Sequence, residues 1–273
     1  MEDLFGMNGE FVTTIEVVPP GGDDIEPLMA ELLSLSGVTF NGFSVATNPV
    51  AKARMSAMVT CHLIQQKTGK PAVLHCTTRD HNRISLQGEL WGAKALGIKT
   101  VMAATGDRVA FKDRGMTSNV SDVDVFELIG MVREAGFTTG VVFDTWPEVN
   151  GLNKAVEKLK KKVVAGAQYA VTQPVYDRAG AEEIFEATKD IGIPVILGIL
   201  PLRTPKHADF LHFKVSGIAV PEDVRKRMHN AEDSIGEGVS NACDMLGIAK
   251  EIFAGACVMP PFDHYEVMPT IIS

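Results

Sequence analysis

Residues 13–20 read Thr13-Thr-Ile-Glu-Val-Val-Pro-Pro20, a short β-branched run that ends at two prolines. This composition is typical of a buried strand followed by a loop. Similar runs recur at fairly regular intervals along the chain. The predicted strands cover residues Phe11–Val18, Thr39–Ala46, Ala72–Thr77, Thr100–Thr105, Thr138–Asp144, Gln168–Gln173, Pro194–Leu200 and Val215–Val220.

Segments with the apolar spacing of helices separate these strands. They lie near residues 24–35, 50–67, 82–96, 122–135, 151–165, 178–191, 205–213 and 221–230, with one more near 236–253. Strict alternation without a linker favours a closed (β/α)8 barrel, a TIM barrel, over an open doubly wound sheet. The chain of 273 residues is close to the usual size of such a barrel, so we expect one domain over residues 1–273.

Charge and cysteine content narrow the classes of function. The net charge is −8 and the only dense basic run is Lys160-Lys-Lys162, which argues against nucleic-acid and membrane partners and favours a small molecule. The four cysteines lack CxxC spacing, and the acidic start MEDLF precedes no apolar signal segment. We therefore expect a cytoplasmic protein with reduced thiols. No metal site is expected, because the neighbours His75 and Cys76 point to opposite sides of a strand.

The first strand carries one carboxylate, Glu16, among apolar residues. In a TIM barrel the active site forms at the carboxyl ends of the strands, where Glu16 lies. Partial burial there would raise its pKa and suit it to donate a proton. The alternative is an ion pair with a neighbouring Arg or Lys.

Other polar residues follow later strands and converge on the same rim. Thr105-Gly-Asp107 places a glycine where a ligand ring could lie against the backbone, and Asp107 could accept hydrogen bonds from that ligand, although turn aspartates are common. Gln173 offers a donor and acceptors suited to the amide edge of a heterocycle, or it could satisfy backbone groups. Each residue alone is weak, and their convergence indicates an active site.

Several motifs in order along nearly the whole chain resemble those of the methylenetetrahydrofolate reductase family. They are Glu16-Val-Val-Pro-Pro20, His75-Cys-Thr-Thr-Arg79, Asn82-Arg-Ile-Ser-Leu-Gln-Gly-Glu-Leu-Trp-Gly-Ala-Lys-Ala-Leu-Gly97, Met102-Ala-Ala-Thr-Gly-Asp107, Lys160-Lys-Lys-Val-Val-Ala-Gly-Ala-Gln-Tyr-Ala-Val-Thr-Gln173, Gly198-Ile-Leu-Pro201 and Met259-Pro-Pro-Phe262.

The resemblance implies a (β/α)8 fold, bound FAD and the interconversion of 5,10-methylenetetrahydrofolate and 5-methyltetrahydrofolate, a step of one-carbon and methionine metabolism. It implies that Glu16 is the general acid that protonates folate N10, that Asp107 lies between flavin and pterin, and that Gln173 binds the pterin. The positions that match the surroundings of FAD are Ala46, His75, Thr105, Gly106, Asp107, Trp146 and Lys162, with Lys162 suited by charge to the cofactor phosphates.

The chain departs from the family pattern at further positions. Leu211 stands where relatives carry an aromatic residue that holds nicotinamide or folate, and His264 stands where an arginine is expected. Both positions remain predicted substrate contacts. Leu211 weakens the expectation of direct NAD(P)H oxidation, and His264 weakens the expected binding of the folate tail. Val17 and Val18 replace two aromatic residues. Some relatives receive electrons through a companion subunit, so the resemblance allows such a partner or a homo-oligomer.

Two other readings stay open at this point. One is a barrel that binds a methylated pterin and transfers its methyl group without redox chemistry, in which case no flavin would be bound. The other is a subunit that keeps a folate-like pocket and needs a partner protein for electron supply. The residues around Thr105-Gly-Asp107 and Lys162 favour a flavin over the first reading, and Leu211 and His264 support the second.

Overall fold

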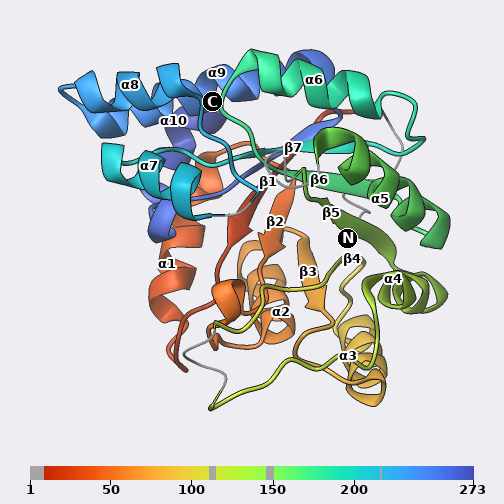
Figure 1. Cartoon of the computed structure of the whole chain (residues 1–273). Coiled ribbons are helices and arrows are strands. Elements are labelled where there is room, and N and C mark those ends of the chain that lie inside the picture. Colours follow the sequence, from red (N-terminus) through yellow and green to blue (C-terminus); the bar gives the residue numbers. More distant parts are fainter. Residues whose placement is uncertain (1–8, 111–114, 146–150, 216) are drawn as a thin grey trace.

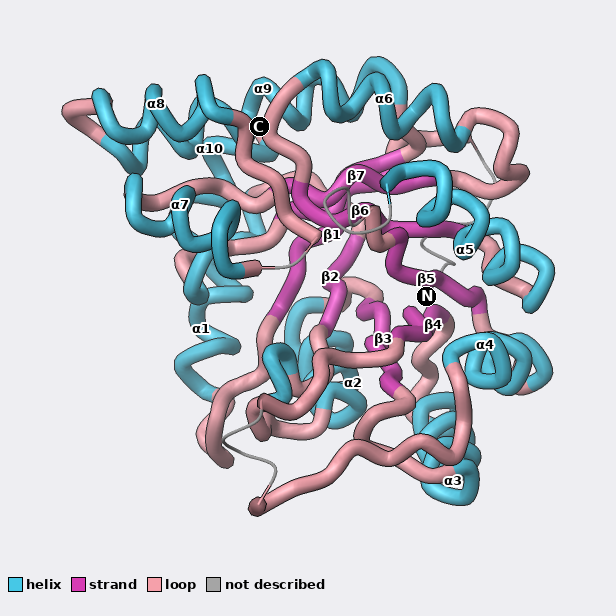
Figure 2. Tube along the Cα trace, in the orientation of Figure 1, coloured by secondary structure: helices cyan, strands magenta, loops and turns pink. Residues whose placement is uncertain are grey.

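The computed structural model describes residues 9–110, 115–145, 151–215 and 217–273. Eight parallel strands form a closed barrel in sequential order, which confirms the predicted (β/α)8 fold. Figures 1 and 2 show the strands at the centre with helices around them. The strands are β1 (Val12–Val17), β2 (Gly42–Val45), β3 (Ala72–Thr77), β4 (Thr100–Ala104), β5 (Thr138–Phe143), β6 (Tyr169–Pro174), β7 (Val195–Ile199) and β8 (Gly255–Val258).

The α-helices lie between the strands except α10, which follows β8, and most begin at a side-chain cap. Asn82, Asp124 and Thr204 each accept a hydrogen bond from a first-turn amide of the helix that follows. The helices are α1 (Glu26–Ser34), α2 (Ala57–Thr68), α3 (Arg83–Ala95), α4 (Val125–Glu134), α5 (Gly151–Ala165), α6 (Arg178–Thr188), α7 (Pro205–Lys214), α8 (Glu222–Asn230), α9 (Ser234–Ile252) and α10 (Met268–Ile272). None of the described helices is long and apolar enough to cross a membrane.

The prediction of the eighth strand at Val215–Val220 is wrong. The described residues of that segment follow α7, where Ile218 and Val220 pack against α7 and α8 in a small apolar cluster. The barrel closes instead through β8, which pairs with both β7 and β1. Gly255 of β8 lies so close to Val12 that an added Cβ would come 2.3 Å from its carbonyl oxygen. Close approach to β1 therefore selects this segment, although its composition is a weak strand signal.

Apolar residues fill the barrel interior as well as the layer between strands and helices. The interior cluster consists of Val73, Met102, Tyr169, Val171, Ile196 and Cys257. Gly140 on β5 leaves the space that the Tyr169 ring occupies, because an added Cβ at Gly140 would lie 2.1 Å from that ring. The lower barrel is thus packed, and the open end lies at the carboxyl ends of the strands.

We predict that Gly140→Ala lowers the free energy of unfolding by about 2 kcal/mol or more, because the new methyl group overlaps the buried ring of Tyr169. Urea denaturation of both proteins measures the difference. Gly247→Ala in α9 is the control, since no atom lies within 4 Å of its added Cβ. Equal losses of stability in the two variants would contradict this packing.

Candidate functional site

The strand register decides which polar side chains face the mouth of the barrel. Glu16 on β1 pairs with Ser44 on β2, and successive residues alternate between the interior and the helices. With Val73, Met102, Val171 and Cys257 inside, the same alternation turns further residues inward. At the carboxyl ends these are Glu16, Ala46, His75, Ala104, Asp144 and Gln173.

Glu16 is half-buried at the upper end of β1. Burial raises the pKa of its carboxyl group to about 7, the direction expected from the sequence. Cys257 on β8 and Tyr265 in the loop beyond it lie near enough for the charge of Glu16 to raise the pKa of both groups. The carboxyl group can therefore hold a proton near neutral pH.

A polar layer lies beneath the mouth, and of its members the sequence analysis identified only His75. Ser44 Oγ and His75 Nε2 share a hydrogen bond of 2.7 Å. Thr14 and Ser44 lie close enough to Cys257 to act against the rise in the pKa of its thiol that burial causes. Burial lowers the pKa of His75 to about 4, so its ring is neutral at pH 7. Counting in steps of two from Glu16 would have found Thr14, but the contacts of Ser44 and Cys257 depend on the register between strands.

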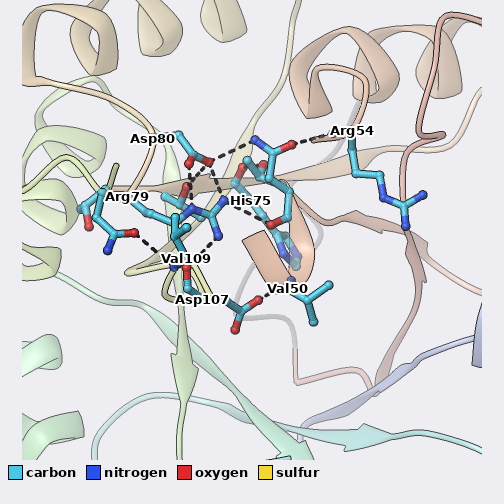
Figure 3. Close-up of polar contacts among 12 residues, drawn as sticks. Val50, Arg54, His75, Arg79, Asp80, Asp107 and Val109 are labelled. Carbon is cyan, nitrogen blue, oxygen red and sulfur yellow. Dashed lines mark hydrogen bonds and ion pairs between the residues drawn. The ribbon is translucent and has the colours of Figure 1, made fainter. Parts of the chain in front are cut away.

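A second network, centred on Arg79 after β3, ties together the loops beside the mouth (Figure 3). Arg79 is only 4% exposed and donates to both carboxylate oxygens of Asp80. It also donates to the carbonyl oxygens of Asp107 at 3.0 Å and Asn48 at 3.2 Å. A planar guanidinium group can donate to all four of these acceptors at once. The sequence motif alone does not reveal these contacts.

The loop after β2 is held in an unusual backbone conformation by the same network. Asn48, Val50 and Ala51 have φ of 44°, 50° and 54°, which is rare outside glycine and costly for a β-branched residue. The Asp107 carboxylate accepts a hydrogen bond of 2.6 Å from the Val50 amide. Asp107 is therefore at the rim as predicted, but its carboxylate is bound to this loop.

The structure gives Gly106 a role within the fold. Its φ is +82°, and an added Cβ would lie 3.2 Å from the Cβ atoms of Thr77 and Arg79. The carbonyl oxygen of the preceding residue, Thr105, accepts a hydrogen bond from the Arg79 amide at 3.2 Å. The Thr105-Gly-Asp107 turn thus packs on the arginine network.

Lys162 lies in the last turn of α5 and is only 6% exposed. Its Nζ atom donates a hydrogen bond of 2.6 Å to the carbonyl oxygen of Val142 on β5. Burial, and to a smaller extent the charge of Lys158, lowers its pKa to about 8, while Asp144 acts in the opposite direction. The predicted phosphate contact remains a prediction, and the ammonium group has a protein partner.

The remaining predicted residues occupy different places. Gln173 is half-buried on β6 and faces inward, whereas Leu211 is buried in the cluster of α7 and α8. His264 follows β8 and pairs through Nδ1 with Glu266. Trp146 lies outside the described residues.

The predicted cofactor positions Ala46, His75, Thr105, Gly106 and Asp107 gather on the β2–β4 side of the mouth. Those predicted for substrate, Gln173, Leu211 and His264, lie on the β6–β8 side, which Glu16 adjoins because β1 pairs with β8. Closure of the barrel thus divides one rim into two adjoining regions.

A closed barrel of eight parallel strands surrounded by helices places the chain in the TIM-barrel class, with the half-buried carboxyl group of Glu16 at its open end. The family model described as methylenetetrahydrofolate reductase matches residues 1–259, so the chain belongs to this family.

Sequence relatives agree with this assignment, and a solved structure shares the fold. The 5,10-methylenetetrahydrofolate reductases of Salmonella typhimurium and Buchnera aphidicola are each 26% identical, over 76% and 74% of this chain and 70% and 69% of theirs. A Caenorhabditis elegans protein named "probable methylenetetrahydrofolate reductase (NADPH)" is 24% identical, and the match spans 64% of this chain but 27% of that protein. A Clostridium thermocellum protein that binds two copies of 5-methyl-5,6,7,8-tetrahydrofolic acid shares the fold, with a TM-score of 0.68, 13% identity and coverage of 96% and 93%.

We predict that Glu16 makes stability depend on pH between about 4.5 and 7. The folded carboxyl group titrates near 7 and the unfolded one near 4.5, so the folded state binds the proton more tightly and the free energy of unfolding falls as pH rises through this range. Glu16→Gln should remove this loss and be more stable than wild type by roughly 3 kcal/mol at pH 8 but not at pH 4. Urea denaturation across pH measures it. The exposed Glu10→Gln is the control, and parallel curves for wild type and Glu16→Gln would contradict the buried carboxyl group.

We predict that Arg79→Lys lowers the free energy of unfolding by about 2 kcal/mol, because a single ammonium group cannot replace the four-way guanidinium contacts. Lys226→Ala, which breaks an exposed ion pair with Glu222, should change stability by less than about 0.5 kcal/mol. A loss for Arg79→Lys no larger than for this control would show that the network contributes little.

Proposed function

We propose that this protein interconverts 5,10-methylenetetrahydrofolate and 5-methyltetrahydrofolate with FAD as cofactor and Glu16 as general acid. The observation that carries the proposal is the half-buried Glu16 at the open end of β1, with a pKa raised to about 7, in a chain of this family. Opening of the methylene bridge needs a proton on folate N10. A carboxyl group with a pKa of about 7 carries a proton in about half of the molecules at pH 7 and can supply it.

The residues on the β2–β4 side suit the flat ring of a flavin. Ala46 and Ala104 carry small side chains at the strand ends, and the neutral His75 between them is hydrogen-bonded to Ser44. When bound, FAD supplies the hydride-transfer chemistry. Thr105 and Gly106 offer backbone beside this surface, and Asp107 would place a negative charge near the ring once it leaves the Val50 amide.

The outer part of the cofactor would need a cation. Lys162 is our candidate for the phosphates, and to reach them its ammonium group would exchange the Val142 carbonyl for phosphate oxygens. Trp146 is proposed as a further cofactor contact from its position in the sequence.

The substrate would occupy the β6–β8 side, next to Glu16. Gln173 offers the donor and acceptors that a pterin edge requires, and His264 and the surroundings of Leu211 would adjoin the rest of the molecule. Folate binding is supported by the Clostridium thermocellum protein, which binds a methylated folate on the same fold. We expect action in the cytoplasm, with NAD(P)H or a companion subunit as the electron source.

A second candidate is a folate-binding barrel without redox chemistry, such as a methyltransferase. It is favoured by one observation: Asp107 and Lys162, both predicted to meet the cofactor, are bound to backbone groups of the protein itself. The visible absorption spectrum separates the two candidates. Released FAD supports the reductase, and a colourless protein that takes up no added FAD overturns it.

We predict that Glu16→Gln slows reduction of methylenetetrahydrofolate by about 100-fold or more, because the amide cannot donate the required proton. Flavin content should stay that of wild type, since Glu16 lies outside the cofactor side. Stopped-flow kinetics with reduced enzyme measures the folate step apart from the reduction of the flavin. Unchanged turnover would remove Glu16 from the mechanism.

A further inference from the structure

The loop after β8 holds an aromatic residue in a strained conformation at the rim of the barrel. Phe262 is 68% exposed, and its backbone lies in the left-handed region with φ of 51° and ψ of 45°. The next residue, Asp263, also has a positive φ of 62°. Aromatic residues rarely adopt this conformation, and such strained residues cluster at ligand-binding sites. The strain and the exposed ring together indicate a binding role for Phe262.

The exposed ring rests on a buried histidine from the neighbouring loop. The ring centroids of His207 and Phe262 lie 4.9 Å apart, with the two planes tilted by 55°. His207 lies in the first turn of α7, and its Nδ1 atom accepts a hydrogen bond of 3.3 Å from the Arg203 amide. Burial, and to a smaller extent the charge of Arg203, lowers the pKa of His207 to about 4. Phe262 therefore rests on a neutral ring at pH 7, while most of its own surface remains accessible.

Arg203, in the loop between β7 and α7, sets a positive charge beside these two rings. Burial acts to raise the pKa of Glu266, but its hydrogen bonds and the charges of His264 and Arg203 lower it. No described carboxylate lies within ion-pair distance of the half-buried Arg203 side chain. Helix α9 packs directly on this loop, because an added Cβ at Gly238 would lie 1.7 Å from the carbonyl oxygen of Leu202. Arg203 is therefore a cation on a fixed backbone, with its guanidinium donors available to an anionic ligand.

The same loop also reaches the predicted general acid. Tyr265 follows Phe262 by three residues, and burial raises its pKa, with smaller contributions from the charges of Asp263 and Glu16. Strand β8 pairs with β1, which carries Glu16. A ligand whose reacting end meets Glu16 can therefore extend across Phe262 to Arg203.

Helix α7 offers no aromatic residue on the side that meets this loop. His207 and Leu211, one turn apart, belong to its buried face, whereas Phe210 is 56% exposed on another side of the helix. An aromatic ring for a ligand at this part of the rim thus comes from Phe262.

We propose that Phe262 and Arg203 form the subsite for the tail of the folate, an inference that rests on the proposed function. Phe262 packs against the p-aminobenzoyl ring, and Arg203 binds a carboxylate of the glutamate that follows it. The two residues supply the ring and the cation that the family pattern places at Leu211 and His264, but they supply them from different loops. The order from Glu16 to Phe262 to Arg203 matches the order of pterin, aromatic ring and glutamate along a folate.

The test compares a folate with a pterin that lacks the tail. Isothermal titration calorimetry of the purified protein measures binding of 5-methyltetrahydrofolate and of 5,6-dimethyltetrahydropterin. Arg203→Ala should weaken folate binding by about tenfold or more and leave pterin binding unchanged, because it removes a charge-assisted contact. Arg203→Lys should restore part of the loss. Lys206→Ala, which removes an exposed cation from α7, is the matched control and should bind both ligands as wild type does.

A second variant separates binding from stability. Phe262→Asn should weaken folate binding by about tenfold or more, because it removes the ring. Its thermal midpoint should be no lower than that of wild type, since asparagine tolerates a positive φ. Phe210→Asn on α7 is the control for loss of an exposed phenylalanine and should not change folate binding. In turnover assays Phe262→Asn should raise KM for methylenetetrahydrofolate more than it lowers kcat.

The outcomes distinguish this inference from the proposed function. If wild type binds 5-methyltetrahydrofolate and both Arg203→Ala and Phe262→Asn bind it equally well, the tail subsite is overturned and the proposed function stands. Equal affinity of wild type for the folate and the tailless pterin has the same meaning. Equal weakening of both ligands by the two variants would assign the residues a structural role and also overturn the subsite. A wild-type protein that binds neither ligand would overturn both proposals.

Discussion

The pairing of β1 with β8 closes the barrel, and the chemistry of the mouth depends on that contact. It sets Thr14 beside Cys257 and brings the loop after β8 next to Glu16. Without closure, the upper end of β1 would be an open edge and its carboxyl group would face water. Closure instead partly removes that group from solvent and raises its pKa. The raised pKa lowers the free energy of unfolding at neutral pH, and it allows the Glu16 carboxyl group to hold a proton there.

Local sequence predicted the fold where a strand differs clearly from its neighbours. Glu16 was found because it is a single carboxylate in a β-branched run, and β7 because its residues are almost all apolar. The strand β8 was missed because Gly255–Val258 is short and has little strand propensity. Its place is set by close contact with Val12, a residue more than 240 positions away, and such contacts leave no local signal.

The inward orientation of the strand residues could be predicted from the sequence, whereas the contacts of the loop residues could not. Glu16 and Gln173 face inward because strand alternation dictates it. The contacts of Asp107 and Lys162 could not be read from the chain, because Arg79, the left-handed loop at Val50 and the Val142 carbonyl decide them. A ligand that recruits either side chain must replace a hydrogen bond within the protein, so part of the binding free energy would be spent on that exchange.

The packed interior below the mouth has a consequence for proton traffic. Val73, Met102, Tyr169, Val171 and Ile196 fill the lower barrel, and Tyr169 occupies the gap left by Gly140. A column of water through the barrel would need space that these side chains take. Any proton that Glu16 exchanges must therefore pass through the same opening through which a ligand would enter. A ligand seated over the mouth would separate Glu16 from bulk solvent. The carboxyl group could then donate at most one proton each time a ligand binds.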